Sequence, residues 1–209
     1  MKFAGKGLLT CMLGAGLVLS PLAGTTVFPM PAVEAAVPIK AWDFSQDIGG
    51  WSYLGGYAYS GDAETAFSPE FGGSLKLDVD FSEDKEQSWS EVKLMDMNVN
   101  SSSPIQAGNG IKAVSFDFYY DASQLKGDAA LKVKLYASNV KGSEVINQPV
   151  DDLGVARAKA VPGTKLKKAS VRVLLDKPVK EDIGHFEWNL VGYLTSYKGA
   201  VYINNLRLE

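Results

Sequence analysis

The sequence predicts an all-β fold, a two-sheet antiparallel β-sandwich or jelly roll. Several segments alternate apolar and polar residues with a period of two, as residues 114–120 do, which is typical of a strand with one buried face. Glycine-containing turn signals, such as residues 47–50, separate these segments. The periodicity indicates no amphipathic helix longer than about two turns. Strands that each have one apolar face must close over a shared core, and two packed sheets are the economical arrangement.

Residues 1–36 are predicted to be a secretory signal peptide. Two lysines precede an apolar run over residues 8–23, and small residues and prolines then lead to a cleavage site after Ala35 or Ala36. A membrane anchor is the alternative, but the apolar run is short and is interrupted by glycine, serine and proline. We therefore expect one secreted domain over residues 37–209.

The predicted strands follow one another through nearly the whole domain. Turn signals at residues 70–73, 107–110 and 198–199 punctuate them. The least regular stretch, residues 147–164, is predicted to be a long loop. In chain order the predicted strands are 39–44, 51–59, 74–81, 89–97, 111–120, 130–138, 170–175, 185–194 and 200–208.

The clearest strands have aliphatic or aromatic residues on one side and polar residues on the other. Trp42 and Trp188 lie in register with apolar neighbours, so both are expected in the core. The apolar sides of the three most regular strands are Val114, Phe116 and Phe118, then Leu131, Val133 and Leu135, then Phe186, Trp188 and Leu190.

Composition excludes several classes of partner and chemistry. The chain has 21 basic and 24 acidic residues, a net charge of −3, and no dense basic patch for nucleic acid. Its one cysteine, Cys11, lies in the predicted signal peptide, so the mature domain would have no disulfide. An exported domain without disulfides suggests a bacterial protein, with no membrane partner after cleavage.

A tryptophan lies on the outward side of one predicted strand. Trp89, Glu91 and Lys93 point away from the side that carries Val92 and Leu94. A sugar has an apolar C–H face for an aromatic ring and a rim of hydroxyls for polar side chains, so this mixture favours a carbohydrate. Ordinary polar decoration of an exposed sheet is the alternative. The further outward candidates are Tyr119, Tyr136, Arg172 and Asn189.

Trp51 has two interpretations. It shares its parity with Tyr53, Tyr57 and Tyr59, and nearby glycines leave space around the rings, which would suit a second stacking platform. Alternatively, Trp51 begins a strand and fills one end of the sandwich core.

The sequence carries little sign of catalysis. His185 is the only histidine, which makes a histidine-rich metal site or a histidine triad improbable. Phosphate-binding, dinucleotide-binding and nucleophile-elbow motifs are absent from the sequence. A glycosidase requires only two carboxylates at a set separation. A small jelly-roll lyase or glycosidase, using Glu91, Lys93, Tyr119 or Glu187, is therefore the alternative to a binding domain.

Three short motifs resemble a known family. Ser-Trp-Ser-Glu-Val-Lys-Leu at residues 88–94 and the C-terminal run at residues 197–206 resemble the mannan-binding carbohydrate-binding modules of family 27. The start, residues 42–44 followed by residues 50–51, is similar to the usual start of those modules. The resemblance extends to the related galactose-binding-like domains of bacterial β-mannanases and covers residues 39–209.

The resemblance implies a jelly roll that binds β-1,4-mannan or galactomannan by stacking and hydrogen bonding. Carried over by position, the stacking roles fall on Trp51 and Trp89 and, more loosely, on Tyr136 in place of a tryptophan. A structural calcium ion is common in the family and would lie near Asp43 and Asn204, although an Asp usually stands where this chain has Asn204. The implied protein is a secreted, non-catalytic module that targets a covalently linked mannan-degrading enzyme.

Overall fold

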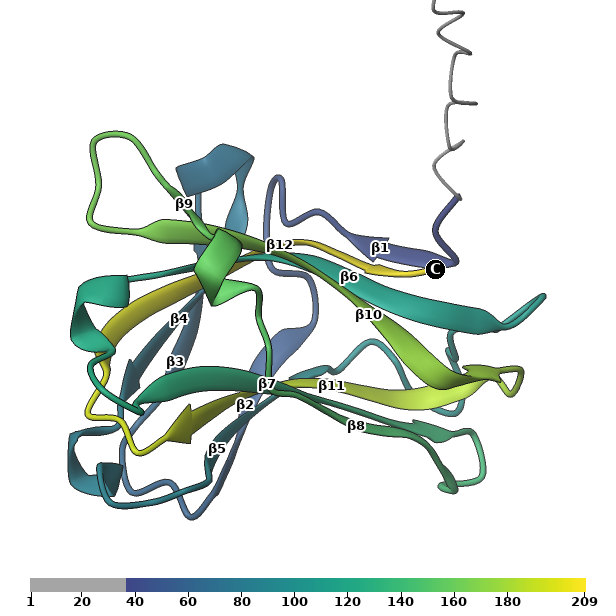
Figure 1. The fold of residues 1–209 in the computed structure, drawn as a ribbon. Helices are drawn as coiled ribbons and strands as arrows, with labels where there is room; N and C mark the ends of the chain where they lie inside the picture. The colour runs from purple at the N-terminus through teal and green to yellow at the C-terminus, as the bar shows by residue number, and fades with distance from the viewer. Residues whose placement is uncertain (1–36) are drawn as a thin grey trace, which may run out of the picture. The chain divides into compact units, whose positions relative to one another are not determined.

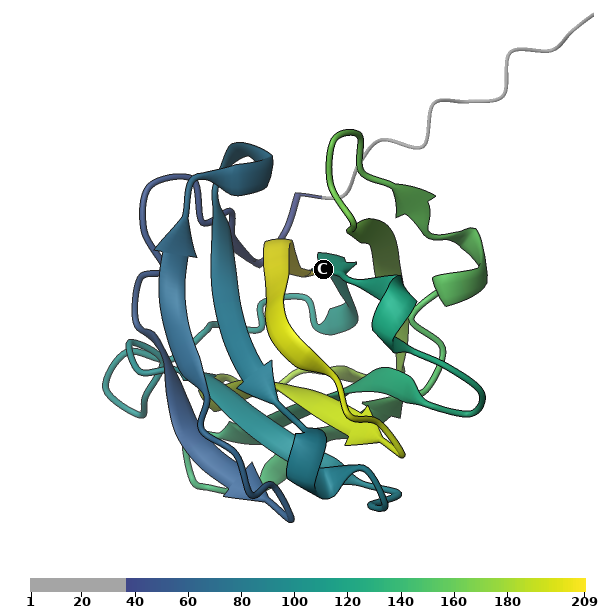
Figure 2. The same ribbon diagram turned by 90° about the vertical axis from the view of Figure 1, so that its left-hand side faces the viewer.

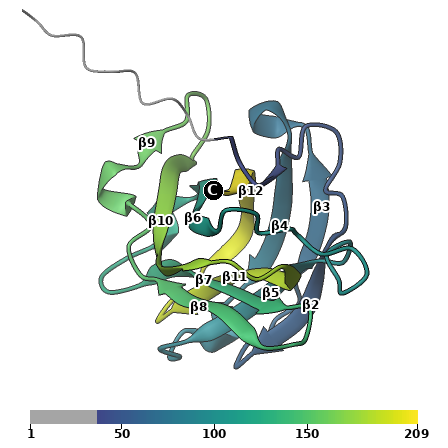
Figure 3. The same cartoon turned by 90° about the vertical axis from the view of Figure 1, so that its right-hand side faces the viewer.

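The computed structural model describes residues 37–209, so the predicted signal peptide lies outside the described residues. These residues form two antiparallel sheets that face each other, which confirms the predicted β-sandwich. Figure 1 shows β6, β10 and β12 in one layer and β7, β8 and β11 in the other. Figures 2 and 3 give the two side views of the same arrangement.

The larger sheet has seven strands. Six of them follow the order β3-β4-β12-β6-β10-β9, and the seventh, β1, pairs with the C-terminal end of β12, beyond the residues of β12 that pair with β4. The first described strand therefore lies beside the last, with Lys40 opposite Leu208. The strands are β1 (Lys40–Trp42), β3 (Glu64–Ser68), β4 (Ser74–Asp80), β6 (Ile111–Tyr120), β9 (Lys159–Ala160), β10 (Lys167–Val179) and β12 (Lys198–Leu208).

The smaller sheet has five strands in the order β2-β5-β11-β7-β8. Its strands are β2 (Trp51–Tyr57), β5 (Ser90–Asp96), β7 (Ala130–Asn139), β8 (Glu144–Val150) and β11 (Ile183–Tyr193). The connections include four short 3-10 helices, η1 (Glu70–Gly72), η2 (Ser82–Asp84), η3 (Ala122–Gln124) and η4 (Val155–Arg157). No helix within residues 37–209 has the length and apolar character needed to cross a membrane.

Three strands, β3, β8 and β9, were not predicted, and all three lie at sheet edges. β8 covers the beginning of the stretch that was expected to be a loop. Its sequence includes Asn147, Gln148 and Pro149, which hide the alternation of apolar residues. An edge strand tolerates proline and polar side chains because one of its sides needs no ladder partner.

The core between the sheets contains a cluster of aromatic rings. Trp42 stacks on Phe186 with ring centroids 5.4 Å apart, and Trp51 meets Trp42 edge-on at 5.5 Å. Trp188 is fully buried and meets Phe116 from the opposite sheet edge-on. Both core predictions, for Trp42 and Trp188, are confirmed. The indole nitrogen of Trp42 donates to Oδ2 of Asp96 over 2.7 Å, so this buried polar group is satisfied.

Candidate functional site

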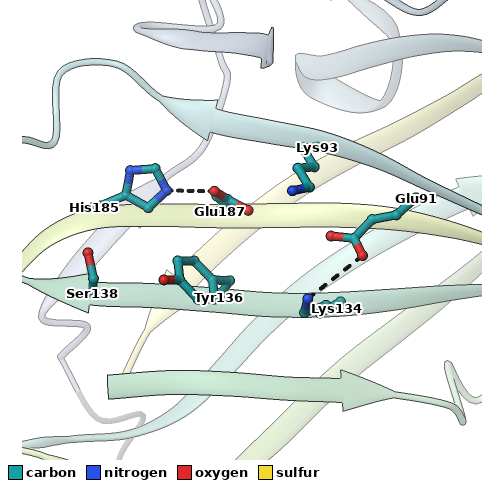
Figure 4. A pocket seen from close by; sticks show the side chains of 7 residues that line it. All are labelled: Glu91, Lys93, Lys134, Tyr136, Ser138, His185 and Glu187. Atoms are coloured by element: carbon teal, nitrogen blue, oxygen red, sulfur yellow. Dashed lines mark hydrogen bonds and ion pairs between the residues drawn. The ribbon is translucent and has the colours of Figure 1, made fainter. Parts of the chain in front are cut away.

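The outer face of the five-stranded sheet carries a polar pocket. Residues opposite one another on antiparallel strands point to the same side, so β5, β11 and β7 bring their outward side chains together. The pocket has a volume of about 480 Å³ and an open mouth (Figure 4). Its lining residues are Glu91, Lys93, Lys134, Tyr136, Ser138, His185 and Glu187.

Glu91 lies in the wall of this pocket with a side chain that is only 3% exposed. Its Oε2 accepts a hydrogen bond from Nε1 of Trp89 at 3.0 Å and lies 3.7 Å from Nζ of Lys134. Its Oε1 accepts from Nδ2 of Asn189 at 2.9 Å. A carboxylate loses its hydrogen bonds to water when it is buried. The donors around Glu91 replace those hydrogen bonds and hold its side chain in one orientation.

Glu187 forms the corresponding contacts at the other end of the pocket. Its Oε2 accepts from Nδ2 of Asn189 at 2.8 Å, and its Oε1 lies 2.6 Å from Nε2 of His185. The ring of Tyr136 meets the ring of His185 edge-on at a centroid distance of 5.8 Å. One network of hydrogen bonds therefore runs from Trp89 to His185 across β5 and β11.

Lys93 lies between these two ends. Its side chain is partly exposed, and it forms no ion pair with any residue in the described part of the chain. Figure 4 places its amine on the pocket side, near Glu187. An ammonium group has three N–H donors, so Lys93 is available to hydrogen-bond a ligand.

Further aromatic rings flank the pocket on the same face of the sheet. Tyr57, at the end of the edge strand β2, lies opposite Glu91 and is 63% exposed. Tyr193, at the end of β11, has the amine of Lys132 over its ring at 4.3 Å. Together with the partly exposed Trp89 and Tyr136, these rings give the face several apolar surfaces beside polar groups.

Comparison with known protein families identifies the family of this chain. Residues 33–209 match the family described as carbohydrate binding module 27. The chain belongs to this family. Family 27 modules are non-catalytic, so the chain is a carbohydrate-binding module and not the lyase or glycosidase considered as an alternative.

Solved structures of family 27 modules have the same fold. TmCBM27, described with specific mannan recognition, matches with a TM-score of 0.56 and 17% identity over 82% of this chain and 96% of its own. CBM27-1 of Caldicellulosiruptor saccharolyticus, solved with mannohexaose, matches with a TM-score of 0.56 and 14% identity over 81% and 97%. A CBM28 module specific for non-crystalline cellulose matches with a TM-score of 0.51 and 17% identity over 77% and 88%. No curated protein matches this chain.

The prediction that Trp51 stacks on a ligand is wrong for this CBM27 domain. Trp51 is 3% exposed and lies among the core rings. The cause is a β-bulge in β2, where the pairing with β5 shifts between Tyr53 and Gly55. Gly55 has a φ of +116°, which favours glycine at this position. The extra residue reverses the parity of the strand, so Trp51 points inward and Tyr57 points outward.

Tyr119 and Arg172 do not join the pocket, which corrects their predicted role in a shared groove. They lie on β6 and β10 and face outward from the seven-stranded sheet, on the opposite side of the sandwich. Tyr119 is 5% exposed because Phe71 stacks on its ring at 4.1 Å. Arg172 pairs with the side chain of Glu209 at 2.8 Å. Alternation identified their outward direction but could not assign their sheet.

The other predicted site residues lie on the pocket face. Glu91, Lys93 and Tyr136 line the pocket, and Trp89 contacts it through Glu91. Asn189 points to the same face but is fully buried, so it lies beneath the pocket and not at its surface. Two pocket residues, Ser138 and His185, were not selected as binding candidates from the sequence, whereas Lys134 and Glu187 belong to the residues predicted to face outward and Tyr57 belongs to the predicted second platform.

The predicted calcium site has few free ligands. Oδ1 of Asp43 accepts the backbone N–H of Ser45, and the side chain is exposed. Asn204 donates to the carbonyl of Phe71 at 3.1 Å and accepts from the N–H of Asn205 at 2.6 Å. Among residues 37–209, no three acidic, histidine or cysteine side chains gather around a common point. The oxygen and the nitrogen of the Asn204 amide both have protein partners, whereas only one oxygen of Asp43 does, and calcium near these residues stays a prediction.

Proposed function

We propose that this carbohydrate-binding module holds a β-1,4-mannan or galactomannan chain in the pocket on the outer face of the five-stranded sheet. The observation that carries the proposal is the juxtaposition of exposed rings with oriented polar groups on one face. Tyr57, Trp89 and Tyr136 offer ring faces to the C–H surfaces of sugars. Lys93, Lys134 and the carboxylates offer partners to the hydroxyls.

The solved family members support mannan as the ligand class. TmCBM27 is described with specific mannan recognition, and the Caldicellulosiruptor module was solved with mannohexaose. The pocket of the present chain is open to solvent, and its lining side chains follow one another along the strands of the sheet (Figure 4). Each stacked ring contributes on the order of 1 kcal/mol beyond burial, so two or three rings acting together would tighten the dissociation constant by roughly 30- to 150-fold.

Isothermal titration with soluble oligosaccharides tests this proposal. Mannohexaose should bind with a dissociation constant on the order of micromolar. Cellohexaose and xylohexaose serve as matched chains that differ in the sugar. Equal affinity for all three would contradict mannan selectivity, and the absence of binding to every glycan would contradict the pocket as a glycan site.

We further propose that residues 1–36 direct secretion and that the module acts by tethering a mannan-degrading catalytic domain to its polysaccharide. The signal-peptide pattern supports export. A tether raises the effective concentration of an enzyme at its substrate without any new catalytic group. Recovery of the cleaved domain, beginning at Ala36 or Val37, from the culture medium would support export; intact intracellular protein would contradict it.

A further inference from the structure

Asn189 lies at the centre of β11, directly beneath the pocket. It belongs to the outward side of the strand, yet its exposure is 0% because the side chains around it close over the amide. It therefore contacts no ligand. A fully buried amide needs hydrogen-bond partners for both its oxygen and its nitrogen, so the role of Asn189 can be inferred from these partners.

The partners of Asn189 determine the orientation of its amide. Oδ1 accepts the backbone N–H of Leu94 on β5 at 3.1 Å. Nδ2 donates to Oε1 of Glu91 at 2.9 Å and to Oε2 of Glu187 at 2.8 Å. A backbone N–H requires an acceptor and two carboxylates require a donor, so the reverse orientation would leave all three groups unpaired.

The two carboxylates held by this amide each orient one end of the pocket. The second oxygen of Glu91 accepts from the indole of Trp89 and lies near Lys134. The second oxygen of Glu187 contacts His185, whose ring lies against Tyr136. The side chains of Glu91 and Glu187 are only 3% and 12% exposed, so repulsion between them is weakly screened unless a donor lies between them.

We propose that Asn189 is a positioning residue that sets the Trp89 end and the His185 end of the pocket together. The inference rests on the proposed glycan-binding function. One N–H₂ group keeps the two carboxylates at a fixed separation, and their outer oxygens then fix the indole at one end and the imidazole at the other. Loss of this donor should disturb both ends of the pocket at once.

Asn189→Asp tests this role most directly. The variant keeps the shape of the side chain and the acceptor for the N–H of Leu94, but it replaces the N–H₂ donor with an oxygen that faces the carboxylates of Glu91 and Glu187. At pH 7.5 its affinity for mannohexaose should fall on the order of tenfold or more. The loss should shrink at pH 5, since a carboxyl crowded by two others is readily protonated and then donates again. The ionisable groups around position 189 are Glu91 and Glu187, with Lys93, Lys134 and His185 beyond them, so the wild type is measured at both pH values for comparison.

A ligand-free readout separates this inference from the proposed function. The indole N–H resonance of Trp89, assigned with Trp89→Phe, should move in Asn189→Asp because Glu91 is no longer held in place. Asn139→Asp is the matched control. Asn139 is also buried, accepts backbone N–H groups and donates to the carboxylate of Glu181, but it does not line the pocket. Its variant should leave both the resonance and the affinity unchanged.

A reversed pair covers the case in which Asn189→Asp does not fold. Combining it with Glu187→Gln places an amide donor opposite the introduced carboxylate on the Glu187 side, so this double variant should be more stable than Asn189→Asp, while Glu91 still lacks its donor and the Trp89 end stays disturbed. The inference is overturned if Asn189→Asp folds with wild-type affinity and an unmoved Trp89 resonance, or if the double variant gives no rescue of stability. If the wild type binds no glycan while the resonance moves as expected, the proposed function fails and the positioning role stands.

Discussion

The indole nitrogen of Trp89 donates to Oε2 of Glu91 over 3.0 Å, which joins a partly exposed ring to a nearly buried carboxylate. This bond restricts rotation of the ring and leaves its faces free, because the N–H lies in the ring plane. A ring held in this way loses little conformational freedom when a sugar stacks on it. The relationship between these two side chains is the basis of the first prediction.

Trp89→Ala should weaken binding to galactomannan about tenfold, because a stacking surface of on the order of 1 kcal/mol plus its buried area is lost. Affinity electrophoresis in galactomannan gels measures the change. Trp89→Phe keeps a ring but loses the N–H, so its affinity should lie between those of the wild type and Trp89→Ala. If Trp89→Ala unfolds the domain, as judged by circular dichroism, the ring is a core residue and the stacking role is wrong.

Trp51→Ala should reduce stability and Tyr57→Ala should reduce glycan binding, although both residues lie on β2. Trp51 is buried among aromatic rings, so its removal should lower the free energy of unfolding by about 3–5 kcal/mol. Tyr57 is 63% exposed on the pocket face, so its removal should weaken glycan binding severalfold with little loss of stability. Urea denaturation and titration of both variants decide the matter. A stable Trp51→Ala with reduced affinity would contradict the effect that we assign to the bulge.

Tyr119→Ala and Arg172→Ala should leave mannan affinity within about twofold of the wild type, because both residues lie on the other sheet. Tyr119→Ala should lower the melting temperature, since Phe71 loses its stacking partner at 4.1 Å. Arg172→Ala removes an exposed ion pair with Glu209 and should change stability by less than about 1 kcal/mol. A tenfold loss of affinity in either variant would place a ligand on the seven-stranded sheet.

The carboxyl of Asp117 should make stability depend on acid pH. Burial raises its pKa, but hydrogen bonds from Lys168, Ser170 and Asn205 outweigh burial and leave the pKa below its usual value. The stabilisation is therefore fully present above about pH 5 and is lost as the pH falls through the lowered pKa. Asp117→Asn should cost on the order of 2 kcal/mol at pH 7 and much less at pH 2.5, as measured by urea denaturation. An equal cost at both pH values would contradict an ionic role for Asp117.

Chelation tests the calcium that the family resemblance implies. If an ion binds near Asp43 and Asn204, EDTA should lower the melting temperature and added calcium should restore it, because the ion binds only the folded state. Asn204→Asp adds the charge that the family usually has at this position and should increase the response to calcium. A melting curve unchanged by EDTA would remove calcium from the account of this chain.

Most of the fold was predictable because alternation with a period of two records which side of a strand is buried. Trp89, Glu91 and Lys93 were placed on the outer face correctly, as were Trp42 and Trp188 in the core. Trp51 failed because a bulge adds one residue and reverses the parity of a strand. The alternation of apolar and polar residues does not predict a bulge, unless a residue such as Gly55 is recognised as a sign of one.

The assignment of strands to sheets was beyond the sequence, and the pocket depends on it. Tyr119 and Tyr136 both point outward, but pairing over long distances in the chain puts them on opposite sides of the sandwich. The alternating residues His185, Glu187 and Asn189 did carry a signal, since three polar groups in a row share one side of β11. The burial of Asn189 depends on its neighbours on β5 and β7, which no local pattern describes.

The pairing of β1 with β12 has a consequence for how the domain is attached to anything else. Lys40 and Leu208 lie side by side on the seven-stranded sheet, while the pocket is on the outer face of the five-stranded sheet. A bead, label or neighbouring domain joined beside Lys40 or Leu208 would be anchored on the seven-stranded sheet, leaving the pocket of the five-stranded sheet facing away from the attachment. The same closeness of the two ends makes the fold suited to circular permutation, in which a short linker joins them and new ends are opened in a distant loop.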